Sequence, residues 1–483
     1  MAHSPSTPNG YHRYHIETQE ALDIHPWPNR FKAWVGKPGL AIHLLKEFIR
    51  NKADMEVVLS RPCLYGVYSG PVGGFWPRPQ KCVACLRCMI EYAHFVQISP
   101  NPKRRQLGDS YFNWKYVEAI ISEAEAGRIP VKGAGYRGEF GGEGWDGMWT
   151  DMSEIVRPTR DGIHGREYIS TSVDIGAKPL FLSLDETGQP YGELPQVINI
   201  PLPFFFDVPS AAVASLKLNK ILAQAAEEIT SLVVLPIKDI LYDNLRGSHL
   251  VPLVTPDEVE RVHILPSRPR IVEMEGWDEG LYREIRTSLP ETLICLRIPF
   301  TAGEALLSYV DKGIRVFHLT ANYHGRSPGG TFVFDLIRAA HNTLVETHRR
   351  DEFTLLGSGG IIAAEHIPKA IIAGLDAVAL DTPLLIAMDG QLGQGKNELV
   401  DRHKGRCRLP APPPAWAVQR LKNLAAAWHG QLLEVLGAMG LREVRRLRGE
   451  IGRALFEKEL EREAFAGIEG YHGGNGEGLK CIR

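Results

Sequence analysis

The chain has 483 residues, 44% of them hydrophobic and 23% charged, a composition that excludes a disordered or fibrous protein. Its 55 Lys and Arg nearly balance its 57 Asp and Glu, so the formal net charge is −2 and no overall basic field indicates a nucleic-acid partner. The first 30 residues contain no apolar run, and we find no uninterrupted apolar stretch of about 18 residues that would predict a membrane span. We therefore expect a soluble, cytoplasmic protein.

The N-terminal part combines polar, helical and irregular sequence. Residues 1–30 read as a polar tail, residues 31–130 as an N-terminal region with a cysteine cluster, and residues 131–194 as a long linker loop. The amphipathic sequence GLAIHLLKEFIRNKADMEVVL predicts a helix within residues 31–60, and Asn113–Ala126 predicts another. The linker is rich in Gly, Trp and Arg, and a loop of this length is usually functional or packed on another element.

From residue 195 to residue 390, short apolar runs alternate with helical patterns. The predicted strands are Val197–Phe206, Ser231–Leu235, His249–Val254, Ile271–Met274, Thr292–Ile298, Arg315–Thr320, Thr354–Ser358 and Ala377–Leu380. The predicted helices are Ser210–Ile229, Glu279–Ser288, Ala302–Lys312, Thr331–Arg349 and Ala364–Ala373. Fully apolar strands that alternate with helices indicate a parallel sheet, and eight such strands suit an α/β fold of the (β/α)8 TIM-barrel type. An open, doubly wound sheet is the alternative.

The remaining residues, 391–483, form the last part. They begin as a polar loop that ends in the stiff proline segment RLPAPPPAW. Residues 416–463 then predict two amphipathic helices that are interrupted near Gly440.

The strongest chemical motif is KCVACLRCM, in which Cys82, Cys85 and Cys88 recur at every third position. Three thiolates at this spacing are typical of iron–sulfur ligation in a reducing compartment, because each ligand approaches a different iron. A [4Fe–4S] cluster needs a fourth ligand, for which Cys63 is the best candidate and His94 the second. With three ligands the site would suit a [3Fe–4S] cluster. Zinc bound by the same ligands and three unligated cysteines are the competing interpretations.

A second motif, GSGG, stands at the end of a predicted strand and before a predicted helix. Gly359 and Gly360 would allow backbone N–H groups to approach an anion there. The next strand ends at Asp381 and Thr382, and the loops after the seventh and eighth strands of a barrel are its usual phosphate site. A tight structural turn is the simpler interpretation, and a carboxylate at Asp381 would repel phosphate unless it is paired.

Two segments of the predicted barrel contain charged or titratable residues that could act in catalysis. The loop HLTANYHGRSPGGTF contains His324, and Arg297 lies within the apolar strand ETLICLRIPF. We predict His324 and Arg297 as catalytic residues at the barrel mouth, against a solvated loop and a buried ion pair as the alternatives. The segment Ser153–Ile169 has three Arg and either clamps an anion or forms a surface salt-bridge network.

The order of these segments resembles that in the FMN-binding synthase domain of glutamate synthases, in the archaeal-type form with a ferredoxin-like N-terminal region. The similarity extends over about residues 80–450. It rests on KCVACLRC, on GWDGMWTDMSEIVRPTRDGIHGREYI, on INIPLPFFFDVPSAAVASLKLNKILAQAA, on GSGGIIAAEHIPKAIIAGLDAVALDTPLLIA and on LKNLAAAWHGQLLEVLGAMGLREVRRL. The most specific of these segments are the GSGG segment and the cysteine triplet.

The resemblance implies FMN in a (β/α)8 barrel. Its cofactor-binding residues would be Gly329, Gly330, Thr331, Gly359, Gly360, Asp381 and Thr382, and Arg297 would replace a Lys near the flavin ring. The sequence departs from the family at Val233–Ile240, which replaces a glycine- and threonine-rich segment, and at Asp381, which replaces a Gly. A cysteine cluster after the barrel and an N-terminal glutaminase domain are also missing from this sequence.

The leading functional hypothesis is therefore an FMN and iron–sulfur oxidoreductase or an electron-transfer subunit, which would work with other redox subunits or an electron carrier as an oligomer or complex. The alternative hypothesis is a flavin-free barrel that acts as an iron–sulfur scaffold or regulatory subunit. An unrelated barrel enzyme with zinc at the cysteines is a third.

Overall fold

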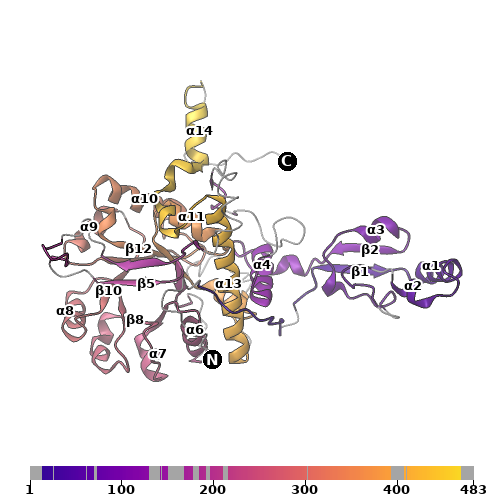
Figure 1. Ribbon diagram of the computed structural model, residues 1–483, viewed down its shortest axis with the longest axis horizontal. Coiled ribbons are helices and arrows are strands. Elements are labelled where there is room, and N and C mark those ends of the chain that lie inside the picture. The colour runs from indigo at the N-terminus through magenta and orange to yellow at the C-terminus, as the bar shows by residue number, and fades with distance from the viewer. Residues whose placement is uncertain are drawn as a thin grey trace. The chain divides into compact units, whose positions relative to one another are not determined.

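The computed structural model of the chain contains two compact units, each of which is described by itself (Figure 1). Unit 1 comprises residues 1–22, 118–129 and 137–483, and unit 2 comprises residues 23–117 and 130–136. The residues that the structure describes are 14–24, 27–60, 63–69, 73–129, 142, 144–150, 168–177, 184–191, 196–209, 216–301, 303–392, 407–409 and 411–468. Most of the Arg-rich segment Ser153–Ile169 lies outside them.

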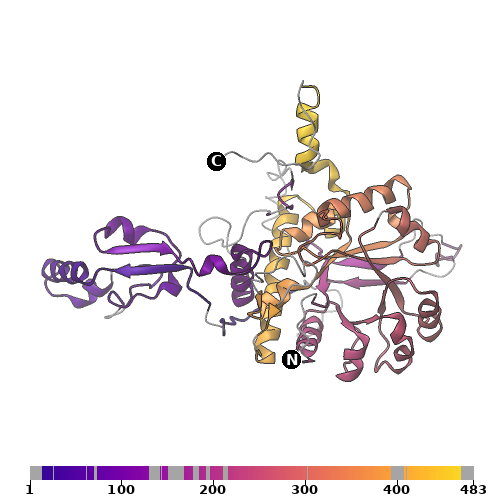
Figure 2. The same ribbon diagram turned by 180° about the vertical axis from the view of Figure 1, so that it is seen from behind.

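Unit 1 is built on a closed barrel of eight parallel strands (Figure 2). The strands are β6 (Phe204–Phe206), β7 (Val233–Pro236), β8 (Leu250–Val254), β9 (Ile271–Glu275), β10 (Leu293–Pro299), β11 (Val316–Thr320), β12 (Thr354–Ser358) and β13 (Ala377–Leu380). Neighbours in sequence pair in order, and β13 pairs with β6 to close the ring. The predicted (β/α)8 class is confirmed and the open sheet is wrong, because an open sheet has no pairing between its first and last strands.

The first predicted strand, Val197–Phe206, is two strands. Val197–Ile200 is β5, which pairs antiparallel with β4 (Val173–Gly176) outside the barrel, and the barrel strand β6 begins only at Phe204. Pro201 and Pro203 separate the two. Proline has no backbone N–H to donate to a ladder, so a continuous strand across these positions is unfavourable.

Helices follow most of the barrel strands. They are α6 (Leu216–Glu228), α7 (Ile237–Tyr242), α8 (Glu279–Ser288), α9 (Gly303–Val310), α10 (Val333–Glu346), α11 (His366–Ala373) and α12 (Thr382–Ala387), with the 3-10 helices η5 (Pro256–Ile264) and η6 (Arg350–Glu352). Helix α8 shows why these segments fold as they do: the Asp278 side chain caps its first turn by accepting from the Leu281 N–H, and Leu281 and Ile285 are buried.

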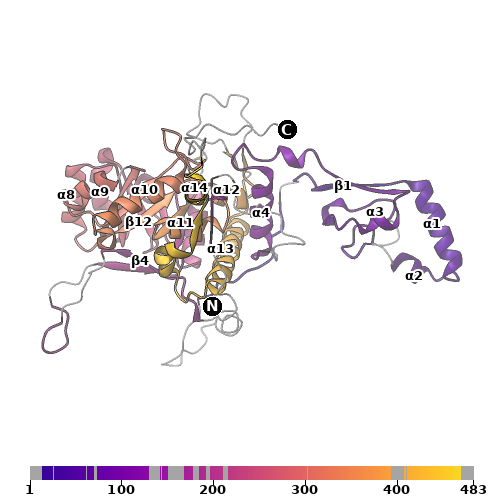
Figure 3. The ribbon, with the colours of Figure 1, turned by 90° about the horizontal axis from the view of Figure 1, so that it is seen from above.

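A long helix, α13 (Pro414–Ala438), packs on the barrel and lies beside the second half of α4 (Trp114–Ala126) (Figure 3). Asn423 of α13 donates to the carbonyls of Gln19 and Ala124 at 2.7 and 2.8 Å. The fully buried Arg420 donates to the Ala387 and Ala21 carbonyls and pairs with Asp389 at 3.3 Å. This helix therefore joins the end of the barrel to the N-terminal segment through satisfied buried polar groups.

The chain after α13 is less helical than predicted. Gly440 adopts a positive φ of 68°, which ends the helical path. The 3-10 helix η7 (Val444–Arg453) and the short helix α14 (Glu457–Phe465) follow it. Short two-stranded sheets pair β3 (Met148–Thr150) with β16 (Ala454–Phe456), and β14 (Gln391–Leu392) with β15 (Cys407–Arg408). None of the helices within the described residues has the length and apolarity that crossing a membrane requires.

Unit 2 is a small α+β arrangement. Strands β1 (Phe31–Val35) and β2 (Val96–Pro100), which the sequence analysis did not predict, pair antiparallel. The expected single helix is α1 (Lys37–Arg50) followed by α2 (Met55–Ser60), because Lys52 and Ala53 turn into the left-handed region between them. The described part of the unit also contains the 3-10 helices η1 (Pro79–Lys81) and η2 (Arg104–Gln106), the helix α3 (Arg87–Glu91) and the first residues of α4.

A buried ionic cluster fixes the seventh and eighth barrel strands to helix α10. Arg350 donates to Asp376 at 2.8 Å, to the Gly374 carbonyl at 2.6 Å and to His341 Nδ1 at 3.2 Å. Asp376 also accepts from the Leu355 N–H and from Arg448. Burial, together with the charges of Arg350 and Arg448, lowers the pKa of His341 to about 4, so this imidazole is neutral in the folded protein and accepts from Arg350.

We expect His341 to make the fold sensitive to mild acid. In the unfolded chain the imidazole titrates near pH 6.5, so the stability due to the neutral ring is present above that pH and is lost as pH falls toward 4. The free energy of unfolding should fall between pH 8 and pH 5 in the wild-type protein. In His341→Gln this fall should be smaller by about 2 kcal/mol. Urea unfolding of both proteins at the two pH values measures this difference. An equal loss in both proteins would contradict the assignment.

Candidate functional site

The glycine pair after β12 forms a tight, buried turn. Gly359 and Gly360 have φ angles of 95° and 73°, in the left-handed region that favours glycine. A Cβ on Gly359 would lie 2.6 and 2.7 Å from the carbonyl oxygens of Asn322 and Ala321. The turn therefore passes so close to the backbone after β11 that no other residue fits at Gly359.

The neighbouring strand end carries Asp381 and Thr382. Ser358 of β12 is in register with Ala379 of β13, so the glycine turn and Asp381–Thr382 leave the barrel at adjacent positions of its C-terminal edge. Both side chains are buried, and the Thr382 hydroxyl has no hydrogen-bond partner among the described residues. A buried hydroxyl without a partner is costly, and it is the kind of group that a bound acceptor such as phosphate would satisfy.

Trp145 covers the glycine turn, and the sequence analysis did not single it out. Its Nε1–H donates to the Gly360 carbonyl at 3.1 Å, and its ring stacks on His366 at 4.7 Å between centroids. Phe332 meets the edge of the same ring at 5.8 Å. The glycine before Trp145 was the sequence signal that could have identified this contact. A Cβ on Gly144 would lie 2.4 Å from the Phe332 ring, so only glycine lets the backbone pass this close to Phe332.

The loop between β11 and α10 has a buried part at Gly325 and an exposed part at Gly329–Thr331. Gly325 packs against Gly360, since a Cβ there would lie 2.9 Å from the Gly360 Cα. The predicted cofactor residues Gly329, Gly330 and Thr331 instead lie at an exposed turn, which Arg326 fastens by donating to the Gly330 carbonyl at 3.0 Å. His324 is half-buried and its ring packs on Tyr323 at 4.0 Å.

Arg297, which the sequence placed inside an apolar strand, is part of an ionic network in the barrel lumen. Its guanidinium donates to both oxygens of Asp207, at 2.8 and 2.9 Å, and to Glu273 Oε1 at 3.3 Å. His318 Nδ1 donates to the same Glu273 oxygen. These four residues, named the lumen network below, come from β10, the end of β6, β9 and β11.

The lumen network is charged and almost sealed from water. The side chains of Asp207, Glu273 and His318 are at most 2% exposed, whereas that of Arg297 is 16% exposed. Burial alone would raise the pKa of Asp207, but Arg297 and His318 hold it below its usual range. Burial likewise opposes the charge of Arg297, and Asp207 and Glu273 raise its pKa above the usual value. Both the carboxylate and the guanidinium are therefore ionised.

Two groups of the lumen network, the Arg297 guanidinium and the His318 imidazole, have polar atoms that could take part in chemistry. The guanidinium edge of Arg297 is the part of the lumen network that solvent reaches. His318 Nε2 is buried and has no hydrogen-bond partner within the part of the chain that the structure describes, its nearest charged neighbour being Asp207 Oδ2 at 3.8 Å. Because Arg297 is compensated by two carboxylates, the network presents a hydrogen-bond donor at the barrel mouth and no surplus positive charge.

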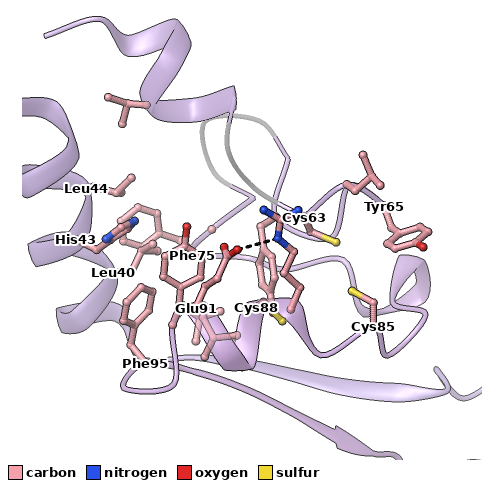
Figure 4. Close-up of a pocket in the computed structure, with 18 residues that line it drawn as sticks. Leu40, His43, Leu44, Cys63, Tyr65, Phe75, Cys85, Cys88, Glu91 and Phe95 are labelled. Atoms are coloured by element: carbon pink, nitrogen blue, oxygen red, sulfur yellow. Dashed lines mark hydrogen bonds and ion pairs between the residues drawn. The ribbon is translucent and has the colours of Figure 1, made fainter. Parts of the chain in front are cut away.

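The four predicted metal-binding cysteines lie in unit 2, and three of them line a cavity of about 730 Å³ (Figure 4). Cys63, Cys85 and Cys88 line the cavity, whereas Cys82, which lies between Cys63 and Cys85 in the sequence, is not one of its lining residues. Ala84 and Leu86 flank Cys85 with φ angles of 55° and 58°. Left-handed residues on both sides of Cys85 are strained for side chains of this kind, and they turn the backbone away from an extended path at this cysteine.

The cysteines influence one another electrostatically without forming a closed ligand set. Burial, followed by the neighbouring thiols, raises the pKa of Cys82, and burial with the charges of Cys85 and Cys63 raises that of Cys88. Tyr68 Oη lies 3.9 Å from Cys88 Sγ. Within the described residues, no three Cys, His, Asp or Glu side chains are close enough to bind one metal ion. His94, the other candidate for the fourth ligand, is exposed.

We expect the lumen network to fail when one charge is removed. Asp207→Asn leaves a buried guanidinium with a poorer partner and should lower the free energy of unfolding by about 3 kcal/mol. Asp335→Asn is the matched control, because Asp335 pairs with Lys458 at 2.9 Å at an exposed site, and it should cost about 0.5 kcal/mol or less. Urea unfolding measures both, and equal costs would show that the network is not a buried ionic unit.

The chain is similar in sequence to archaeal-type glutamate synthases, at low identity. No family model matches the chain. It is 22% identical over 445 residues to the archaeal-type glutamate synthase [NADPH] of Dehalococcoides mccartyi, covering 77% of this chain and 86% of that protein. It is 23% identical over 515 residues to the archaeal glutamate synthase [NADPH] of Archaeoglobus fulgidus, covering 89% and 98%.

A shorter match, to the archaeal glutamate synthase [NADPH] of Methanocaldococcus jannaschii, is 32% identical over 142 residues and covers 26% of each chain. Among solved structures, a variant of mandelate oxidase with benzaldehyde aligns with a TM-score of 0.37 and 14% identity, covering 64% of this chain and 98% of that one. The two sequence matches that extend over most of both chains lead to one conclusion: this protein is a divergent relative of the archaeal-type glutamate synthases.

Proposed function

We propose that this protein is a glutamate synthase-like oxidoreductase that binds FMN at the barrel mouth and an iron–sulfur cluster in unit 2. The observation that carries the proposal is the buried turn at Gly359 and Gly360 beside the unpartnered Thr382 hydroxyl. This is the position after the seventh and eighth strands at which (β/α)8 barrels bind phosphate. The names of the sequence relatives support the same class of chemistry.

The residues present fit a phosphate group in most respects. The backbone of Gly359 and Gly360 and the hydroxyl of Thr382 would hold it. The buried Asp381 opposes an anion, so its carboxylate must be paired or protonated when the cofactor binds. The exposed turn at Gly329–Thr331 contributes no buried surface, and the proposal does not depend on it. FMN would supply hydride or electron transfer.

The chain's own contribution at the barrel mouth would come from the lumen network. Asp207 and Glu273 fix the plane of the Arg297 guanidinium, so its exposed N–H groups can bind and orient an acceptor atom. His318 Nε2 can hold a proton below that position, since Glu273 fixes the ring by accepting from Nδ1. His324, which lies in the loop after β11, remains a proposed substrate-side residue.

In unit 2, the proposed cluster ligands are Cys63, Cys82, Cys85 and Cys88, which supply the type of donor that [4Fe–4S] clusters take, although no three of them lie close enough together among the described residues to bind one metal ion. The loss of one ligand from this set would leave three thiolates, as in a [3Fe–4S] cluster. The cluster would pass single electrons between the flavin and another redox subunit or an electron carrier. Iron content separates this assignment from zinc at the same thiols.

A second candidate function has specific support. Asp381 stands in the phosphate position, and Arg297 carries no surplus charge with which to stabilise an anionic cofactor. Both features favour a barrel that has lost its flavin and acts as an iron–sulfur scaffold or regulatory subunit. Anaerobic purification, an absorbance spectrum and quantification of iron and acid-released flavin distinguish the two functions. Flavin together with iron supports the enzyme, and iron without flavin supports the scaffold.

We expect Thr382→Val to weaken flavin binding about tenfold, because one hydrogen bond to a charged phosphate is lost. Valine keeps the shape and removes a hydroxyl that has no partner among the described residues, so the fold should not be destabilised. Flavin titration and thermal unfolding measure the two effects. Thr287→Val, at an exposed position of α8, is the matched control and should leave flavin affinity unchanged. Equal affinity in both variants would refute the phosphate site.

We also expect Cys85→Ser to lose most of the bound iron, because serine is a poor ligand for an iron–sulfur cluster. Cys407→Ala is the control. Cys407 lies in unit 1, and burial raises the pKa of its thiol to about 12, so it is unsuited to bind metal as a thiolate. Iron per chain is measured after anaerobic purification. Full iron content in the Cys85 variant would remove the cluster assignment.

A further inference from the structure

The helix α1 of unit 2 has an apolar face that the fold does not bury. Ile42, Leu45 and Ile49 follow one another at intervals of three and four residues, so they share one face of the helix. These three residues are 58–70% exposed, and Phe48 beside them is 39% exposed. We call the four residues the α1 outer face. A surface helix of a globular protein normally presents charged and polar side chains on its exposed side.

The other side of α1 packs on the rest of unit 2. Leu40 is buried, and a Cβ on Gly39 would lie 2.5 Å from the Cβ of Phe95. The His43 ring packs on Tyr92 and Phe95, with centroid distances of 4.9 and 5.6 Å. Figure 3 shows α1 at one end of unit 2. The helix is therefore fixed without burial of its outer face, and a cluster of exposed apolar residues of this kind marks an interaction site.

Basic residues flank the α1 outer face. Lys46 and Arg50 lie one turn apart on α1, Lys52 follows in the turn to α2, and all three are exposed. The one acid in the sequence of α1 is Glu47, whose side chain is only 13% exposed and lies 3.7 Å from Arg50. The surface beside the apolar residues is therefore positively charged.

Unit 2 as a whole is strongly basic. It contains 15 Lys and Arg and 6 Asp and Glu, a formal net charge of +9. Asp54 and Glu56, which follow α1, are two of these six acids. A second copy of unit 2 would carry the same positive charge, which disfavours the pairing of two outer faces. The charge instead favours a partner with an apolar interior and an anionic surface.

We propose that the α1 outer face inserts into the surface of a bilayer that contains anionic lipids, with Lys46 and Arg50 on the lipid phosphates. The inference goes beyond the proposed function and rests on neither flavin nor iron. A helix that lies in the plane of the interface buries its apolar face at the boundary between headgroups and acyl chains. Long basic side chains beside that face extend to the phosphates. Such binding is peripheral and needs no membrane-spanning helix.

The two kinds of interaction depend on different conditions. Salt screens the attraction between basic side chains and anionic lipids, whereas the insertion of apolar side chains depends on the area that leaves water. Binding should therefore require anionic lipid, weaken with salt, and be lost when either the apolar residues or their basic neighbours are replaced.

The test is co-sedimentation of the full-length protein with vesicles of phosphatidylcholine and phosphatidylglycerol in equal parts. Binding at low salt should weaken about tenfold or more at high salt, and equally on vesicles of phosphatidylcholine alone. Ile49→Ser should weaken binding about tenfold, because one large apolar side chain no longer leaves water. The matched control is Ile264→Ser, which replaces an isoleucine of unit 1 that is 65% exposed, and it should leave binding unchanged.

A pair of double variants tests the basic residues. K46Q/R50Q should weaken binding at low salt about tenfold. The control K103Q/R105Q makes the same change in the net charge of unit 2 at exposed positions after β2. Because β1 and β2 are antiparallel, that segment leaves the strand pair at the Phe31 end, whereas α1 follows Val35 at the other end. The control should change binding about threefold at most.

Several results would overturn the proposal. These are no binding to the mixed vesicles, equal binding to the two kinds of vesicle, equal effects of Ile49→Ser and Ile264→Ser, and equal effects of the two double variants. A dimer that Ile49→Ser dissociates, measured by light scattering on a protein that does not bind vesicles, would assign the α1 outer face to a second copy instead. Far-ultraviolet circular dichroism shows whether each variant has folded, and Leu45→Ser takes the place of Ile49→Ser if that variant has not.

Discussion

The lumen network of Asp207, Glu273, Arg297 and His318 is the constraint on which the barrel depends. These residues belong to four different strand segments, and each is charged or polar in a space that is almost closed to water. Removing charges from water is costly, and the cost is offset only when every partner is in position. The network can therefore form only when the first, fourth, fifth and sixth strands have taken their places. Cys295, on the same strand as Arg297, is buried beside it, so the lumen is a packed core and not a pore.

The same network limits the chemistry of the mouth above it. Arg297 is the one member with appreciable exposure, and its charge is neutralised from below. It can orient a ligand through directed N–H groups, but it adds little attraction for an anion. The proposed phosphate position also combines opposing charges, because the glycine turn and Thr382 favour an anion and Asp381 opposes one. If the proposed flavin binds here, these residues would determine how firmly its phosphate is held.

Unit 2 brings a different physical problem, because it combines high positive charge, exposed apolar side chains and thiols in about 100 residues. A small unit with few buried apolar residues gains limited stability from its core. Strain at Ala84 and Leu86 adds to that limit. Ligand binding by the cysteines would compensate, since metal ligation contributes directly to folding. Unit 2 has a formal net charge of +9 whereas the whole chain has −2, so the two units differ in the charge that they present to a partner.

The sequence by itself determined the barrel, because every barrel strand lies within a predicted apolar run or at most a few residues beyond it, and the seventh and eighth predicted strands have the bounds observed. It also located the glycine turn, since a positive φ and close backbone approach both require glycine. It did not separate β5 from β6 at Pro201 and Pro203, and it missed β1 and β2, which are paired with each other from opposite ends of unit 2. Only the tertiary structure decided that Arg297 binds Asp207, 90 residues away, that Trp145 covers Gly360, and that Gly329–Thr331 lies at an exposed turn. These facts depend on which strand ends meet across a closed ring, and local pattern carries no information about pairing between such distant residues.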